Sequence, residues 1–308
     1  MKSENPLSRT LTSETKNYFL LGLAGTAAGF LFFSAPLRHP GAVGGIFLEA
    51  RSEFPLAKDS PHRVRKNVSV QLSLPELLAR AALVKDTERP TVLYSKNPDE
   101  PIPIASLTKL MTALLVKKLV SPEVMVEIRA EDTKAAPYKL NLEPGESILV
   151  KDLLKGMLIA SANDAALALA RHAGGSIGRF VELMNDEAKK LKMKNTAFQN
   201  PVGFDDPGHF STASDLALLV EEFMRHPDLM GMVGQKEALF YSVDGARSHR
   251  LISTNKLLAN ARVLGIKTGY TNEAKGNIII LVGEEKYFFI FLGSEEREAD
   301  AERLMTWM

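Results

Sequence analysis

IASLTKLMTALL, residues 104–115, is the stretch that decides the fold of this chain. Its apolar residues recur with the period of a helix that begins at about Ser106. Residues three apart on a helix share a face, so the Lys109 amine can reach the Ser106 hydroxyl. A serine is a poor nucleophile until a base takes its proton, and lysine becomes such a base when its pKa falls. The pair therefore predicts an activated serine.

A second motif, Ser161-Ala162-Asn163, interrupts a helix-like run of apolar residues. Serine and asparagine favour such breaks because their side chains bond to nearby backbone groups. A hydroxyl and an amide on this turn can also point into a cleft. The chain holds further S-x-x-K and S-x-N matches, so the order and context of the motifs must carry the argument. The additional matches begin at Ser3, Ser13, Ser95 and Ser253.

The third motif, Lys267-Thr268-Gly269, occurs once and follows a short apolar strand at residues 263–266. Lys267 is the expected second cation, whose charge would lower the pKa of Lys109. Gly269 is expected to leave space for the backbone of a ligand that binds as an added strand. Taken in this order, the three motifs predict a serine acyl-transfer site.

Strand patterns lie at both ends of the region that holds the motifs, and helical patterns lie between them. Hairpins are predicted at 81–85 with 91–95 and at 277–282 with 287–292, and helices at about 106–119, 151–172, 177–191 and 213–225. This order predicts an α/β fold, with an antiparallel sheet flanked by helices and an inserted helical subdomain. The site would lie between the sheet and the insertion.

Composition narrows the classes of function. The chain has 308 residues, a net charge of +1, 45% hydrophobic residues and no cysteine. It shows no basic pattern for nucleic acid, and disulfides and cysteine catalysis are excluded. Its six histidines form no H-E-x-x-H pair, so a zinc peptidase is not expected. Neither a metal nor a cofactor is predicted.

Residues 18–37 are almost entirely apolar and are long enough to cross a bilayer as a transmembrane helix. Basic residues ahead of them favour a cytoplasmic N-terminus. Because Phe33 and Ala35 make a poor cleavage site, an uncleaved membrane anchor is expected, with a cleaved signal peptide as the alternative. The predicted divisions are a tail and anchor at 1–37, a tether and lead-in at 38–78, and an extracytoplasmic catalytic domain at 79–308.

The chain resembles the D-alanyl-D-alanine carboxypeptidases of the low-molecular-mass penicillin-binding proteins over about residues 80–308. The three motifs match that family in order. Further matching stretches run over residues 92–97, 103–113, 200–204, 209–216 and 254–258. The resemblance implies a β-lactamase/DD-peptidase-like fold in a bacterial cell-membrane enzyme. It also implies removal of the terminal D-alanine from peptidoglycan stem pentapeptides, with β-lactam antibiotics as covalent inhibitors.

The resemblance implies catalytic roles for three side chains. Ser106 would be the nucleophile and Lys109 its general base. Ser161 would pass a proton to the leaving amine. The backbone N–H groups of Ser106 and Tyr270 would form the oxyanion hole, where negative charge develops on the carbonyl oxygen.

The resemblance implies substrate-binding roles for a further set of residues. Asn163 would hold the substrate amide, and Lys267 would tune the electrostatics of the site. Thr268, next to Gly269, would contact the terminal carboxylate. Arg297 matches a family arginine that helps to bind this carboxylate, which suits a guanidinium fork.

The sequence departs from the family at a few points. Ala162 stands where many relatives have glycine, and Tyr270 stands where histidine is frequent. Both changes are mild, since one exchanges small residues and the other contributes a backbone group. Many relatives continue into a β-rich second domain with a C-terminal membrane anchor, whereas this sequence ends at Met308.

Three rival functions share parts of this pattern. A DD-endopeptidase would use the same residues. A serine β-lactamase would need a glutamate-activated water, and the nearest match, at Glu182, lies in an amphipathic helix where an exposed charge is expected. A penicillin-binding or wall-binding module without turnover is disfavoured by the intact Ser106, Lys109 and Lys267.

Overall fold

The computed structural model describes residues 75–135, 137–283 and 286–308. The chain divides into two units, Met1–Gln71 and Leu72–Met308, and every described residue belongs to the second unit, which is compact. The predicted membrane span at residues 18–37 lies outside the described residues. Among the residues that are described, no helix is both long and apolar enough to cross a membrane.

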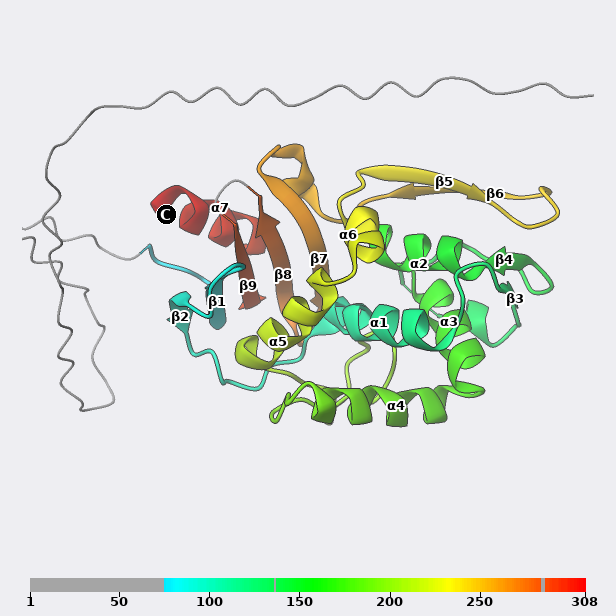
Figure 1. The fold of residues 1–308 in the computed structure, drawn as a ribbon, viewed down its shortest axis with the longest axis horizontal. Coiled ribbons are helices and arrows are strands. Elements are labelled where there is room, and N and C mark those ends of the chain that lie inside the picture. Colours follow the sequence, from blue (N-terminus) through cyan, green and yellow to red (C-terminus); the bar gives the residue numbers. More distant parts are fainter. Residues whose placement is uncertain (1–74, 136, 284–285) are drawn as a thin grey trace, which may run out of the picture. The chain divides into compact units, whose positions relative to one another are not determined.

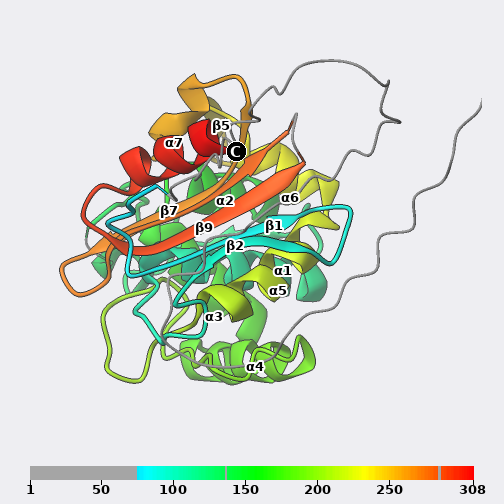
Figure 2. The same ribbon diagram turned by 90° about the vertical axis from the view of Figure 1, so that its left-hand side faces the viewer.

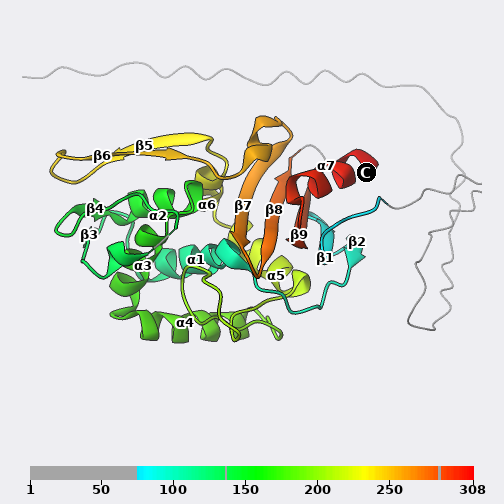
Figure 3. The same cartoon turned by 180° about the vertical axis from the view of Figure 1, so that it is seen from behind.

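The second unit is built on a five-stranded antiparallel sheet (Figures 1 and 3). In spatial order the strands are β2 (Val92–Lys96), β1 (Ala81–Asp86), β9 (Tyr287–Ser294), β8 (Lys275–Val282) and β7 (Val263–Thr271). The first two strands and the last three come from opposite ends of this unit. Pairing of β1 with β9 joins them, and β7 is left at one edge of the sheet.

Helices cover both faces of the sheet. α1 to α6 follow β2 and precede β7, whereas α7 follows β9. Their bounds are α1 Lys109–Leu119, α2 Val150–Ile159, α3 Asn163–Gly174, α4 Ile177–Lys190, α5 Ala213–Met224, α6 Pro227–Val233 and α7 Arg297–Trp307. α5 packs against β1 and β9, α6 against β7, and α7 against β8 and β9. Figure 2 shows α7 on one side of the sheet and α1 and α5 on the other.

The central strands are apolar because both of their faces are covered. Ile279 of β8 packs into a large apolar cluster shared with α1 to α5, whereas Ile278 and Ile280 pack into a smaller cluster with Leu304 of α7. Successive side chains of a strand point to opposite faces. A continuous apolar run therefore fits a strand that is buried on both sides.

Smaller elements complete the unit. Two ribbons pair β3 (Met125–Glu127) with β4 (Ser147–Leu149) and β5 (Glu237–Tyr241) with β6 (Ser248–Ile252), and 3₁₀ turns lie at Ala105–Thr108, Asp132–Lys134 and Lys256–Ala259. The β5–β6 ribbon packs against α2, as Figure 1 shows.

The structure confirms both predicted hairpins and the predicted helices at 177–191 and 213–225. The helix predicted at 106–119 consists of a 3₁₀ turn at Ala105–Thr108 followed by α1. The helical pattern at 151–172 corresponds to α2 and α3, which are separated at residues 160–162 where the sequence predicts a break. The two ribbons and α6 were not predicted. The helices between β2 and β7 form the predicted insertion.

Candidate active site

Ser106 lies in a 3₁₀ turn that leads directly into α1. The preceding Ala105 has a positive φ of 48°, and its carbonyl accepts a 2.8 Å hydrogen bond from the Thr108 hydroxyl. A Cβ at Gly203 would lie 1.8 Å from the same carbonyl oxygen, so only glycine lets that loop pass so close. The backbone before Ser106 is therefore held from two sides.

Lys109 is fully buried, and three oxygen atoms surround its Nζ atom. Ser106 Oγ and Asn163 Oδ1 lie 2.8 Å away, and the carbonyl oxygen of Val202 lies 2.7 Å away. Burial holds the pKa of Lys109 well below its usual range, and the positive charge of Lys267 lowers it further. The sequence predicts that the charge of Lys267 lowers the pKa of Lys109, whereas in the structure burial is the larger cause.

The turn between α2 and α3 carries Ser161 and Asn163. Ser161 has a positive φ of 58°, and its hydroxyl lies 2.9 Å from Lys267 Nζ. Asn163 begins α3, and its Nδ2 donates to the carbonyl of Pro137 at 2.6 Å. Ala162 has a φ of −64°, which any residue adopts, so alanine at this position introduces no strain.

Lys267 and Thr268 lie on β7 beside this turn. Lys267 is 1% exposed, and its Nζ atom donates to Ser161 Oγ and, at 3.0 Å, to the carbonyl of Thr268. Burial, followed by the charge of Arg297, lowers the pKa of Lys267 to about 7. The Thr268 hydroxyl lies 2.8 Å from the hydroxyl of Thr254, which comes from the family-like stretch at 254–258.

Gly269 is packed against the turn that holds the serine. A Cβ at this position would lie 2.9 Å from the backbone nitrogen of Ser106 and 3.2 Å from the carbonyl oxygen of Ile104. The sequence predicts that this space takes a ligand backbone, whereas in the structure the turn at residues 104–106 fills it. The glycine thus brings β7 and the serine together.

Arg297 begins α7 and approaches β7 from the side of the sheet. Its Nη1 donates to the carbonyl of Gly269 at 2.6 Å, and its Nε donates to Glu298 at 2.9 Å. The guanidinium is mostly buried, with 17% of the side chain exposed. The positive charge of Arg297 therefore lies close to Lys267 and contributes to the low pKa of that lysine.

A cavity of about 400 Å³ opens over Ser106. Its walls come from the loop between β3 and β4, the start of α3, a loop before α5 and the end of β7. The lining residues are Ser106, Pro137, Tyr138, Asn163, Val202, Gly203, Phe204, Asp205, Tyr270, Thr271 and Asn272. Tyr270, whose backbone is predicted to serve the oxyanion hole, is half exposed at this cavity.

His209 supports the serine turn and had no role assigned from the sequence. Its Nδ1 accepts from the backbone N–H of Gln199 at 3.1 Å, and its Nε2 lies 2.8 Å from Thr108 Oγ1. Because Thr108 gives its own proton to Ala105, the His209 Nε2–H must be the donor in that contact. Burial lowers the pKa of His209 to about 4, so the ring is neutral. The match of its stretch to the family was the only sequence signal.

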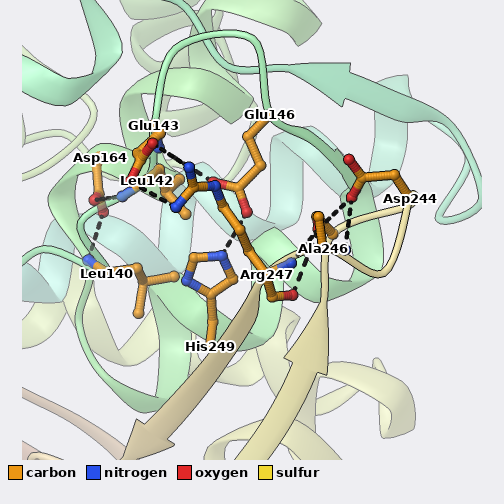
Figure 4. A network of polar contacts seen from close by, with 10 residues as sticks. Leu140, Leu142, Glu143, Glu146, Asp164, Asp244, Ala246, Arg247 and His249 are labelled. Atoms are coloured by element: carbon orange, nitrogen blue, oxygen red, sulfur yellow. Dashed lines mark hydrogen bonds and ion pairs between the residues drawn. The ribbon is translucent and has the colours of Figure 1, made fainter.

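A network of polar contacts, buried in part, braces the loop that forms one wall of the cavity (Figure 4). Asp164 of α3 accepts from the backbone N–H groups of Leu140 and Leu142 at 3.1 and 3.3 Å. Further along the loop, Glu146 lies 2.5 Å from Nε2 of His249 on β6. The loop is therefore attached to both α3 and the β5–β6 ribbon.

The competing sequence motifs have other surroundings. Ser253 accepts from the backbone N–H of Asn255, which caps the 3₁₀ turn that follows. Glu182 is exposed on α4 and pairs with Arg179 at 2.5 Å. Within the described part of the chain, no group of three histidine or acidic side chains is placed to hold a metal ion.

Comparisons with known proteins find D-alanyl-D-alanine peptidases among the similar chains. D-alanyl-D-alanine carboxypeptidase DacF of Bacillus subtilis is 37% identical over 203 residues, which cover 64% of this chain and 52% of DacF. A D-alanyl-D-alanine endopeptidase of Pseudomonas aeruginosa is 34% identical over 245 residues, covering 76% of this chain and 78% of that protein. The Streptomyces K15 DD-transpeptidase structure matches with a TM-score of 0.72 at 26% identity, over 76% of this chain and 98% of that one.

The chain spans about half the length of DacF. Residues 67–289 match the D-alanyl-D-alanine carboxypeptidase family profile, and this range holds all three motifs. Both the matched length and the relatives lead to one conclusion: the chain belongs to the D-alanyl-D-alanine carboxypeptidase family.

Proposed function

We propose that this protein is a serine D-alanyl-D-alanine carboxypeptidase, which removes the terminal D-alanine from peptidoglycan stem pentapeptides through an acyl-enzyme on Ser106. The observation that carries the proposal is the 2.8 Å contact between Ser106 Oγ and the buried amine of Lys109. Family membership supports the same activity.

The surroundings of Lys109 suit a neutral amine, which donates two hydrogen bonds and accepts one. Asn163 Oδ1 and the Val202 carbonyl are acceptors only, so they take the two N–H groups. The lone pair is left for the proton of Ser106. A lysine kept neutral by burial and a nearby cation is a competent general base.

In the proposed acylation, Ser106 Oγ bonds to the carbonyl carbon of the scissile amide while its proton passes to Lys109. The backbone N–H groups of Ser106 and Tyr270 stabilise the oxyanion. The carbon–nitrogen bond then breaks as Ser161 gives its proton to the leaving D-alanine and takes one from Lys267, 2.9 Å away. Lys109 ends protonated and Lys267 neutral, so the total charge is conserved. Water then hydrolyses the ester.

The free carboxylate of the substrate is proposed to bind at Thr268, within β7. Thr268 offers a hydroxyl, and the charges of Lys267 and Arg297 favour an anion there. Asn163 uses one N–H of its amide on Pro137, which leaves the other for the substrate carbonyl. These groups demand a peptide with a free end.

A DD-endopeptidase is the second candidate, because the Pseudomonas aeruginosa relative bears that name and the chain covers 78% of it. A serine β-lactamase is less well supported. Among the described residues that line the cavity, Asp205 is the only carboxylate, and Glu182 is exposed in an ion pair with Arg179.

The test is to incubate the full-length protein with a stem pentapeptide and with a cross-linked stem dimer, and to identify the products by mass. Loss of one D-alanine from the pentapeptide is expected. Cleavage of the dimer alone would assign the endopeptidase activity instead. Labelled penicillin should acylate the parent but not Ser106→Ala, and labelling that persists would identify a different nucleophile.

We further propose that residues 18–37 anchor the protein in the bacterial cell membrane. The apolar composition of this span supports the proposal, and so does the poor cleavage site after it. Residues 38–78 would then be a tether, and the catalytic domain at 79–308 would face the peptidoglycan, where stem peptides and β-lactams are met.

A further inference from the structure

The site is electrically asymmetric along β7. The buried amine of Lys267 and the guanidinium of Arg297 lie near residues 267–269 of the strand. Asp205 lies beside Thr271, the last residue of the strand. The described residues that line the cavity include neither lysine nor arginine. A ligand that carries a negative group at one end and a positive group further along would match this pattern.

The carboxylate of Asp205 is held in a fixed position at the cavity wall. Its Oδ1 accepts a 2.6 Å hydrogen bond from Thr271 Oγ1, which itself accepts from the backbone N–H of Ala274 at 2.9 Å. Because a hydroxyl has one proton, the proton of Thr271 is committed to Asp205. A carboxylate has about four acceptor sites, so most of the capacity of Asp205 is left for a ligand.

Asp205 contacts Thr271 at the end of β7, and this position determines which residue of a bound stem peptide would lie beside its carboxylate. β7 is an edge strand, so a peptide can add to it. A stem with its carboxylate at Thr268 and its scissile carbonyl at Tyr270 runs antiparallel to β7, and its preceding residues pass Thr271. Strand residues advance about 3.3 Å each, so Thr271 lies about 10 Å beyond Thr268. That distance brings the third residue of a pentapeptide to Asp205.

We propose that Asp205 is a subsite for a side-chain ammonium on the third residue of the stem. The protein then prefers stems whose third residue is a diamino acid with an unmodified side-chain amine. The inference rests on the proposed function, which places the carboxylate end of the substrate. A charge-assisted hydrogen bond between ammonium and carboxylate supplies the preference.

The experiment uses the full-length protein and two pentapeptides that differ only at the third residue, which is lysine in one and Nε-acetyl-lysine in the other. The readout is kcat/KM for release of D-alanine. The parent should prefer lysine by about fivefold, the scale of a partly exposed ion pair. Asp205→Asn should cleave both peptides equally.

Asp206→Asn is the matched control, because it removes the same charge one residue further along. Asp206 is not among the residues that line the cavity, and asparagine can keep its 2.8 Å contact with the Gly208 N–H. The control should retain the preference for lysine. Loss of the preference in this variant would assign it to the general charge of the loop and overturn the subsite.

The remaining outcomes distinguish failure of the carboxypeptidase function from failure of the Asp205 subsite. No D-alanine from either peptide would overturn the proposed function. Equal cleavage of both by the parent would leave that function standing and overturn the subsite, with the contact between Asp205 and Thr271 then a purely structural link. If Asp205→Asn does not fold, a salt titration of the parent decides, since screening should bring the two kcat/KM values together. A preference that is independent of salt would overturn the ammonium subsite.

Discussion

Lys267 is a site residue whose charge changes near neutral pH. Its pKa of about 7 follows from burial and from the nearby Arg297. In its charged form it lowers the pKa of Lys109 and attracts a carboxylate. A bound carboxylate would stabilise that charged form and raise the Lys267 pKa again.

The first prediction concerns the pH dependence of D-alanine release. As pH rises through about 7, Lys267 of the unbound protein loses its proton, so kcat/KM should fall. The falling limb of kcat should lie at higher pH, because the bound substrate keeps Lys267 charged. Initial rates between pH 5 and pH 10 measure both limbs. Coincident falling limbs would contradict this coupling.

The second prediction concerns replacement of the same lysine. Lys267→Ala removes a positive charge near Lys109, which raises the pKa of Lys109 and moves the rising limb of penicillin acylation to higher pH. The shift should be limited, because burial is the larger cause of the low pKa. Acylation should also slow by about a hundredfold with loss of the Ser161 contact. Lys151→Ala, which removes a partly exposed lysine paired with Glu123, is the control. An unchanged pH profile in Lys267→Ala would make this lysine a binding residue alone.

The third prediction tests whether His209 positions the serine. His209→Phe keeps a ring but removes the donor to Thr108 and the acceptor for the Gln199 N–H. Penicillin acylation per folded molecule should slow by about tenfold or more, with little change in apparent affinity. His209→Gln, which has both a donor and an acceptor, should recover much of the rate. A loss of melting temperature alone, at the parental acylation rate, would show a purely structural role.

At the scale of elements, the cavity wall depends on the attachment of the loop before α2 to the β5–β6 ribbon. Two acidic residues of this loop face the ribbon in different surroundings. Glu146 is buried against His249, whereas Glu143 forms a half-exposed ion pair with Arg247. The energetic weight of the two contacts should therefore differ.

The fourth prediction compares these two contacts. Glu146→Ala leaves the buried His249 and the partly buried backbone N–H of Glu143 without an acceptor, so the free energy of unfolding should fall by about 2–4 kcal/mol. Glu143→Ala should lower it by less than about 1 kcal/mol, because exposed pairs are screened by solvent. Urea unfolding of both variants measures the difference. Equal losses would show that the buried contact contributes no more than the exposed one.

At the scale of the whole molecule, Leu72–Met308 forms a compact unit with its own apolar clusters on both faces of the sheet. All the site residues discussed above lie within it. The unit therefore holds the whole proposed site, whereas the proposed membrane anchor at residues 18–37 lies before it.

The fifth prediction follows from this division. The full chain should fractionate with membranes and keep its N-terminal residues, whereas residues 72–308 expressed alone should be released from membranes and bind labelled penicillin. Fractionation with N-terminal mass analysis measures the first outcome, and gel fluorescence the second. A full-length product that leaves the membrane with a new N-terminus after Ala35 would instead identify a cleaved signal peptide.

Local patterns were sufficient to predict much of the fold. Both sheet hairpins and most long helices were predicted because their apolar periodicity spans many residues. The β3–β4 ribbon has strands of three residues with exposed positions, which leaves too short a pattern to recognise. Burial alternates along the strands of the β5–β6 ribbon, but apolar residues also stand at exposed positions, so the sequence itself does not alternate between apolar and polar residues. These exposed residues are Leu239, Tyr241 and Ile252.

The sequence by itself determined the pairing of Ser106 with Lys109, because a spacing of three residues over a helical turn, here the 3₁₀ turn that leads into α1, fixes that distance through local geometry. Only the tertiary structure decided what surrounds the pair. Val202, His209 and Gly269 reach it from distant segments, and no local pattern encodes such contacts. The low pKa of Lys109 likewise depends first on burial, and burial exists only once the insertion has packed against the sheet.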